Sequence, residues 1–376
     1  MSVCLLLAAV VADLPPADAA AFRETVEVLA APELRGRAWP ESREAANYVA
    51  RRMGDSGLTP LFGTRFVEPI FDKEGREIGE NVGAMLLGSD PKMAGEFVLV
   101  TAHHDHIGVI GRQVHPGAND NASGVAMVLE VARILCQQSH PRTVVFVSFG
   151  LEERMLWGSR TFVADPPVDL SKIQLFITAD MLGRPLGDLP TDAVFAIGSE
   201  SVGVEGSAAG AFADELDALS VKTGQPVLRI GGDVVGTRSD YGPFRDKEVP
   251  FVFFSTGENP DYHQPTDVPD RLHYETAARI TDVIAAVAAD AADRSDSLVW
   301  SEEHPLDVHE AAAFLTVARL VLSEADAGRF DLPVVQRLLV QQVEDRAAAV
   351  VKRGVMTESE RAVLKRAAQM MMVSIF

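Results

Sequence analysis

The sequence contains little cysteine and a deficit of positive charge. Only Cys4 and Cys136 occur among its 376 residues, which excludes a scaffold held together by disulfide bonds. Lysine and arginine number 34 against 54 for aspartate and glutamate, so the net charge is −20. A chain this acidic is repelled by nucleic acid and by anionic membrane surfaces, and we expect neither as a partner.

Long apolar runs are also missing from the sequence. The run at residues 3–12 falls far short of the roughly 20 residues that a membrane-spanning helix requires. Residues 17–19 (Ala-Asp-Ala) resemble the cleavage site of a secretory signal, although no lysine or arginine precedes the apolar run. Residues 1–20 therefore form either a leader, which predicts a secreted or periplasmic protein, or a buried N-terminal segment of a cytoplasmic one.

The composition is otherwise that of a folded protein, with 47% hydrophobic and 23% charged residues. Between residues 80 and 295, short unbroken apolar runs alternate with helical stretches, which is typical of strands buried on both faces of a sheet. We predict an α/β three-layer sandwich around a mixed, mostly parallel sheet, in a domain spanning residues 21–296. The predicted strands are 98–102, 144–149, 173–177 and 251–254, and the predicted helices are 125–136, 211–221 and 276–292.

The character of the chain changes after residue 296. Glycine becomes rare and apolar residues recur at helical spacing, as at Leu315, Ala318 and Leu322. Pro333 stands where a helix could begin. We predict that residues 297–376 form a C-terminal extension of three helices that serves packing or dimerisation rather than chemistry.

Polar residues follow each of the four predicted strands. Because ligands bind at the C-terminal ends of the strands in open α/β sheets, these residues point carboxylates and imidazoles at one region. Such a mixture suits zinc, or else cobalt or manganese, and acidic groups this crowded need a cation between them. Two metal ions about 3.5–4 Å apart are the usual arrangement when five or more such ligands converge, and it serves hydrolysis. In chain order, the residues are His103, His104, Asp105 and His106, then Glu152 and Glu153, then Asp180, then Tyr262 and His263.

The paired glutamates suggest a division of labour. Adjacent residues in a loop can point in different directions, so one carboxylate can bind metal while the other faces the attacking water. The second carboxylate can then accept the proton of that water and pass it to the leaving amine.

Five motifs along this part of the chain occur together in one known family. They are Ala102-His103-His104-Asp105-His106, the run from Gly117 to Gly124 (GANDNASG), Glu152-Glu153 followed by Gly158-Ser159, the run from Ala179 to Arg184 (ADMLGR), and the run from Asp261 to Asp267 (DYHQPTD). With these motifs the chain resembles the di-zinc aminopeptidases of the bacterial secreted leucyl aminopeptidase type, which are related to the glutamate carboxypeptidases. The resemblance covers roughly residues 30–295, where Leu34-Arg35-Gly36-Arg37 resembles the start of the family's domain.

The resemblance implies a zinc-peptidase fold, a peptide substrate and two zinc ions per chain, with cobalt or manganese as substitutes. Transferred to this sequence, it makes Asp120 a bridge between both metals. His103 and Asp180 would complete one metal site, and Glu153 and His263 the other.

The resemblance also implies roles for three residues that are not metal ligands. Glu152 would be the general base, and Asp105 would hold the other ring nitrogen of His103. Tyr262 could donate a hydrogen bond to the developing oxyanion. The family often has a cis peptide bond after the bridging aspartate, which here would join Asp120 to Asn121.

The remaining histidines are not predicted to bind metal. The family uses one ligand in this loop, so His104 and His106 are expected to be packing or surface residues. His115 and His140 are interpreted as surface or structural residues, as are His273, His304 and His309.

Three functions remain open at this stage. The leading one is a metal-dependent exopeptidase that removes N-terminal residues from peptides. A carboxypeptidase or a glutaminyl cyclase could use the same fold. A carboxypeptidase would need cationic groups near the site, for which Arg184 and Arg238 are candidates. A glutaminyl cyclase uses one zinc ion. A non-catalytic binding module is the third, but such modules lose ligands, and none of the five is missing here.

Overall fold

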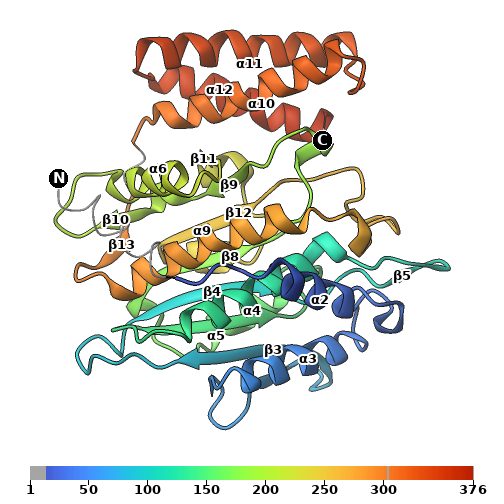
Figure 1. Cartoon of the computed structure of the whole chain (residues 1–376), viewed down its shortest axis with the longest axis vertical. Helices are drawn as coiled ribbons and strands as arrows, with labels where there is room; N and C mark the ends of the chain where they lie inside the picture. The colour runs from blue at the N-terminus through green and yellow to red at the C-terminus, as the bar shows by residue number, and fades with distance from the viewer. Residues whose placement is uncertain (1–13, 303–304, 376) are drawn as a thin grey trace.

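The computed structural model describes residues 14–302 and 305–375 (Figure 1). The apolar segment expected to act as a leader, residues 3–12, lies outside the described residues. Residues 17–19 lie at the start of helix α2, where Asp18 caps the helix and its backbone N–H donates to Glu130. Secretion or a periplasmic location stays a prediction.

A mixed sheet of nine strands forms the centre of the molecule, as predicted. Its strand order is β1-β3-β7-β4-β8-β12-β9-β11, with β2 paired to β3. The central strands β7, β4, β8 and β12 run parallel, because each of these neighbouring pairs is parallel. The strands are β1 (Thr59–Pro60), β2 (Val67–Phe71), β3 (Glu77–Leu86), β4 (Phe97–His103), β7 (Thr143–Phe149), β8 (Ile173–Ala179), β9 (Val194–Ile197), β11 (Val227–Ile230) and β12 (Phe251–Ser255).

The four predicted strands are confirmed as β4, β7, β8 and β12, each within two residues of its expected ends. Every residue of β7 and of β8 is buried, which explains why the sequence shows unbroken apolar runs instead of alternation. Two short strand pairs lie outside this sheet: β5 (Val109–Ile110) with β6 (Gln113–Val114), and β10 (Val202–Val204) with β13 (Leu298–Trp300).

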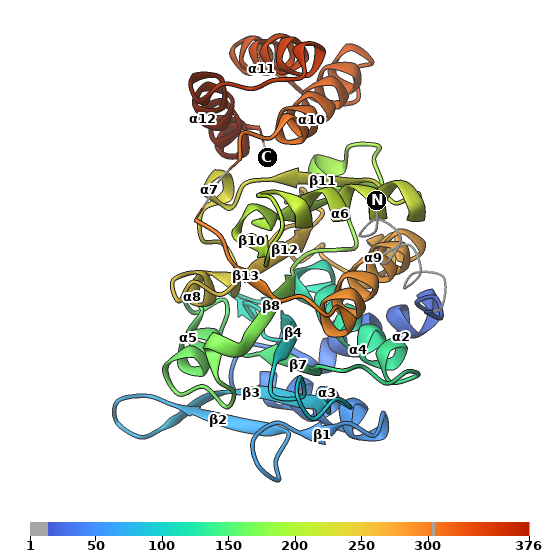
Figure 2. The same ribbon diagram turned by 90° about the vertical axis from the view of Figure 1, so that its left-hand side faces the viewer.

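Helices cover both faces of the sheet and complete the three layers (Figure 2). One apolar core lies under five helices: α2 (Ala19–Leu29), α3 (Ser42–Asp55), α4 (Ser123–Leu135), α6 (Ala211–Thr223) and α9 (Tyr274–Asp293). The opposite core includes side chains of α5 (Trp157–Ala164), α7 (Gly232–Val235) and α8 (Tyr241–Arg245).

The predicted C-terminal extension contains three helices, which form a layer at one end of the molecule (Figures 1 and 2). They are α10 (Val308–Asp326), α11 (Val334–Arg353) and α12 (Glu358–Ser374). Helix α10 contacts β11 and helix α12 contacts α7, so the three helices pack on the edge of the sheet that ends in β11. Their buried residues belong to the same core as α5 and α8.

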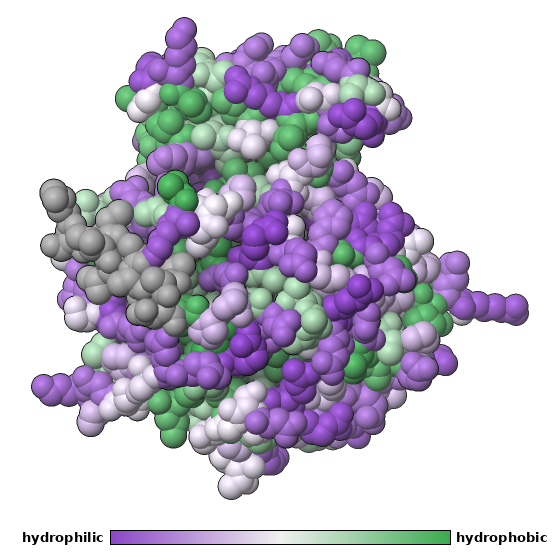
Figure 3. Space-filling model, viewed as in Figure 1, coloured by the Kyte–Doolittle hydropathy of each residue, from purple (hydrophilic) through white to green (hydrophobic). Residues whose placement is uncertain are grey.

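The surface in Figure 3 is mainly hydrophilic over the sheet domain, in keeping with the acidic composition, and apolar residues gather on the C-terminal helices. None of the described helices combines the length and the apolar character that crossing a membrane would require.

Candidate metal centre

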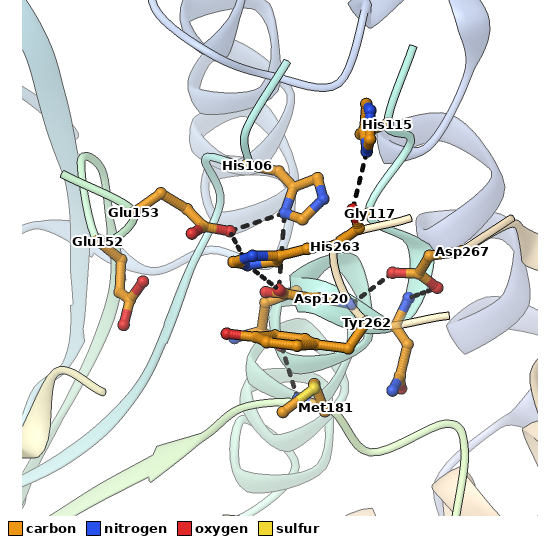
Figure 4. A network of polar contacts seen from close by, with 12 residues as sticks. His106, His115, Gly117, Asp120, Glu152, Glu153, Met181, Tyr262, His263 and Asp267 are labelled. Atoms are coloured by element: carbon orange, nitrogen blue, oxygen red, sulfur yellow. Dashed lines mark hydrogen bonds and ion pairs between the residues drawn. The ribbon is translucent and has the colours of Figure 1, made fainter. Parts of the chain in front are cut away.

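The parallel strands bring the predicted site residues to one edge of the sheet. His103 is the last residue of β4, and Asp180 directly follows β8. Glu152 and Glu153 lie in the loop after β7, and His263 lies in the loop after β12. Asp120 comes from the turn that leads into α4, and Figure 4 shows it beside His263 and near Glu153.

The Asp120 carboxylate lies between two sets of ligand-type atoms. Its Oδ1 is 3.5 Å from Nε2 of His103, and that Nε2 is 3.4 Å from Oδ2 of Asp180. Its Oδ2 is 3.2 Å from Nε2 of His263, which is also 3.2 Å from Oε1 of Glu153. All five predicted ligands are therefore in contact through Asp120, with one histidine and one other carboxylate on each side.

The electrostatics of the site fit bound cations. Burial raises the pKa of Glu152 well above its usual range. The positive charge of His103 acts to lower this pKa, and the negative charges of Asp240 and Asp180 act to raise it. Burial also raises the pKa of the Asp180 carboxyl. Within residues 14–302 and 305–375, Oδ1 of Asp180 is buried without a hydrogen-bond partner, and Nε2 of His263 is buried with its two carboxylate neighbours at 3.2 Å outside hydrogen-bond geometry. Buried carboxylates and orphaned imidazole nitrogens at these distances are what a divalent cation would satisfy, so the donor set suits zinc.

Asp105 supports the glutamate pair as well as His103. Its Oδ1 accepts the backbone N–H of Glu152 at 3.0 Å, and its Oδ2 accepts that of Glu153 at 3.3 Å. Nδ1 of His103 is 3.7 Å from Oδ1 of Asp105 and only 3.2 Å from its backbone oxygen. The closer contact with the imidazole is thus made by the main chain, while the carboxylate fixes the loop that presents Glu152 and Glu153.

Tyr262 packs on the ring of His263. The two ring centroids are 3.9 Å apart with an interplanar angle of 22° (Figure 4). Burial raises the pKa of the Tyr262 phenol, and the negative charge of Asp120 and Asp180 adds to this effect. The hydroxyl therefore stays protonated at neutral pH and is available as a donor.

His106 contributes to the site in a way that the sequence did not reveal. Its Nδ1 is 2.8 Å from Oε1 of Glu153, and its ring packs edge-on against His263 with centroids 5.5 Å apart. Its ring atoms also fall within the group of possible metal ligands formed by Asp120, Glu153 and His263. Of the two positions expected for His104 and His106, packing or surface, the structure shows packing, because both side chains are buried. His104 is a packing residue whose Nδ1 is 3.1 Å from Oγ of Ser148.

The turn that carries Asp120 is held from two sides. Asp267 accepts the backbone N–H groups of Asn119 and Asp120 at 2.9 and 3.1 Å. The peptide bond between Asp120 and Asn121 is cis, as the family resemblance implied. Gly117 enters the turn at φ 63°, and a Cβ there would lie 2.2 Å from the carbonyl oxygen of Asp120, so the close approach requires glycine.

Arg37 holds the same turn from the other side. Its guanidinium is buried and donates to the carbonyl oxygens of His104 at 2.8 Å, Pro116 at 2.5 Å and Gly117 at 2.7 Å. Burial lowers its pKa to about 10, so the group stays charged at neutral pH. Arg37 thus ties the loop after β4 to the turn before α4, which explains why a buried arginine stands in the Leu34–Arg37 motif.

We expect Arg37→Met to lower the free energy of unfolding by about 3–5 kcal/mol, because it leaves several buried carbonyl groups without a donor. Urea unfolding of the metal-free protein measures this loss. Arg35→Met is the matched control, because Arg35 belongs to the same motif but its side chain is 58% exposed and pairs only with Glu41 among the ion pairs described. Equal stability of the two variants would contradict the role assigned to Arg37.

Comparison with known proteins identifies the family. The profile of peptidase family M28 matches residues 81–288, more than half of the 376 residues. The chain belongs to peptidase family M28. The matched region contains all five predicted metal ligands and the loops that support them.

Individual curated proteins are similar to part of the chain, and a solved structure shares its fold. Aminopeptidase YwaD of Bacillus subtilis (strain 168) is 29% identical over 204 residues, which cover 52% of this chain and 41% of YwaD. An aminopeptidase of Pseudomonas aeruginosa is 31% identical over 163 residues, which cover 43% of this chain and 28% of that protein. The solved structure of an aminopeptidase from Aneurinibacillus sp. strain AM-1 superposes with a TM-score of 0.57 at 17% identity, covering 77% of this chain and 98% of that one.

The structural likeness confirms the fold. The matched part of the chain spans less than half the length of these two curated relatives.

Proposed function

We propose that the chain is a metal-dependent aminopeptidase that binds two zinc ions. In this proposal Asp120 would hold both ions, His103 and Asp180 would complete one site, and Glu153 and His263 would complete the other. The observation that carries the proposal is the position of the Asp120 carboxylate, whose two oxygens face two separate pairs of ligand-type groups. The names of the M28 relatives, all described as aminopeptidases above, support the same activity.

Each supporting residue has a chemical task in this proposal. Bound zinc ions would polarise the scissile carbonyl and make a water molecule acidic enough to ionise near neutral pH. Glu152 accepts the proton of the attacking water and delivers it to the leaving amine, which suits a partly buried carboxylate with a raised pKa. Asp105 keeps Glu152 in place through its backbone N–H. Tyr262 donates a hydrogen bond from its hydroxyl to the oxygen that becomes negative in the transition state.

The pairing of the nearby arginines favours an aminopeptidase over a carboxypeptidase. A carboxypeptidase needs a cationic side chain that is available to the substrate's carboxylate. Arg184 is buried and forms ion pairs with Asp188 and Asp261, and Arg238 pairs with Glu258 at 2.6 Å. Both candidates for that role are therefore neutralised by acidic partners within the chain. The five convergent ligands likewise favour a two-metal site over the single zinc of a cyclase.

The proposal is tested with a pair of peptides that differ only at the N-terminus. We expect the zinc-, cobalt- or manganese-loaded protein to release the first residue of a peptide with a free amine and to leave the N-acetylated form intact. Mass spectrometry of the digest identifies the bond that is cut. Cleavage of both peptides at the C-terminus would indicate a carboxypeptidase, and no cleavage with any of the three metals would contradict the proposal.

A further inference from the structure

A cavity extends from the metal centre to the C-terminal helices. At one end it is lined by Asp180, Met181 and Tyr262, which follow β8 and β12. At the other end it is lined by Phe314 of α10 and Val343 of α11, with further residues of α12. The extension that the sequence assigned to packing alone therefore borders the same space as the proposed catalytic residues.

The wall of this cavity is mainly apolar. Phe195 and Ile197 of β9 and Phe253 of β12 line it from the sheet, while Ala368, Met371 and Met372 line it from α12. Besides Asp180, the charged groups in the lining are Arg238 and Glu258, which pair with each other. The volume is about 150 Å³, and apolar cavities of about this size bind molecules such as benzene. Apart from Asp180, which the proposed function assigns to the metal centre, the lining offers a charged side chain no unpaired partner of opposite sign. The space thus suits one large apolar side chain.

The C-terminal helices are fastened in a way that fixes this wall. Arg361 of α12 contacts Glu310 of α10 at 2.8 Å and Asp233 of α7 at 2.7 Å. Lys365 of α12 also contacts Asp233 at 2.7 Å. The buried positions Phe314, Val343 and Met371 join the helices to the core below them. A wall held by both ion pairs and apolar packing can set the size of the cavity.

We propose that the C-terminal helices form the far wall of the substrate pocket and determine which N-terminal residue the protein accepts. This inference rests on the proposed aminopeptidase function. A peptide whose scissile carbonyl lies at the metal centre places its first side chain next to Met181 and Tyr262, and the cavity continues from there to α10 and α12. Peptides that begin with a large apolar residue, such as leucine or phenylalanine, are the preferred substrates, and Phe314, Ala368 and Met372 limit the size of that residue.

The test narrows the cavity from the helical side without touching the metal centre. Ala368→Phe adds a ring to the lining, and Ala362→Phe makes the same change on α12 at an exposed position outside the lining. We expect Ala368→Phe to lower kcat/KM at least about tenfold for peptides that begin with leucine or phenylalanine, relative to peptides that begin with glycine. Ala362→Phe leaves this ratio unchanged. Phe314→Ala widens the cavity. It raises kcat/KM for peptides that begin with tryptophan relative to kcat/KM for peptides that begin with leucine.

A binding measurement accompanies the kinetics, because leucine released by the reaction occupies the same space. Calorimetric titration measures the affinity for free amino acids. We expect leucine to bind more weakly to the Ala368→Phe variant than to the unchanged protein, and glycine to bind equally to both. If the variants Ala368→Phe and Phe314→Ala are both active and neither changes the preference for the first residue, the inference is overturned. The aminopeptidase proposal then still stands. An unchanged protein that cleaves none of the peptides overturns the proposed function, and the assignment of the cavity with it.

Discussion

Glu152→Gln is expected to lower kcat by about 10²–10⁴-fold while the protein keeps its full metal content, because the amide cannot accept the proton of the attacking water. Glu152 is the carboxylate that the proposal leaves free of metal, and Asp105 holds its backbone in place whichever side chain is present. Peptide hydrolysis measured alongside elemental analysis of the same sample separates the loss of a base from the loss of a ligand.

Glu200→Gln is the control for this experiment. The atoms that could hold a metal ion form two groups, one with His106, Asp120, Glu153 and His263 and one with His103, Glu152 and Asp180. Glu200 belongs to neither group; it is, like Glu152, a partly buried carboxyl, its pKa is raised by burial to about 7, and it accepts the backbone N–H of Gly232. We expect near-normal turnover from it. A Glu152→Gln protein with normal turnover would show that another group is the base, and one that had lost metal would show that Glu152 is itself a ligand.

Asp120→Asn is expected to abolish activity by removing metal from both sites at once. The amide keeps the shape of the side chain but supplies only one oxygen, and it carries no charge to offset two cations. Loss of a residue that merely supports a ligand costs about 10–100-fold in metal affinity or activity, so the loss of the bridge should exceed that range. Calorimetric titration with zinc measures the change in affinity and stoichiometry together.

A surface aspartate provides the comparison for Asp120. Asp192 pairs with Arg279 at 2.8 Å, and both side chains are about half exposed. Asp192→Asn should bind zinc as the unchanged protein does. If Asp120→Asn binds two zinc ions with unchanged affinity, Asp120 does not bridge them.

The fold, and the edge of the sheet where the predicted site residues meet, were predictable because their signals are local. β4, β7, β8 and β12 are buried along their length and therefore appear as unbroken apolar runs, and the polar residues that follow them mark the edge where the site lies. His103, Asp180 and the glutamate pair each stand directly beyond such a run.

Other features of the site depend on contacts between distant segments. β4 ends at His103, so the alternation of side chains along a strand does not predict which way His106 points. The path of the loop places its side chain against Glu153. The task of Arg37 is set by carbonyl groups that lie up to 80 residues away along the chain. Asp240 is wholly buried near Glu152, and burial raises its pKa to about 7, but only the tertiary structure places it beside the loop that follows β7.

The C-terminal helices illustrate the same limit. Their helical spacing was visible in the sequence, but their position over β11 and α7 was not. The cavity joins residues from β9, β12 and three later helices, and only the tertiary structure brings these together. A segment interpreted as a packing element can therefore line a cavity that reaches the predicted metal centre.

Anomalous diffraction from zinc-loaded crystals tests the central claim most directly. The proposal predicts two zinc peaks about 3.5–4 Å apart on either side of the Asp120 carboxylate. One peak should lie against His103 and Asp180, and the other against Glu153 and His263. A single peak, or two peaks that do not share Asp120, would contradict the two-metal centre.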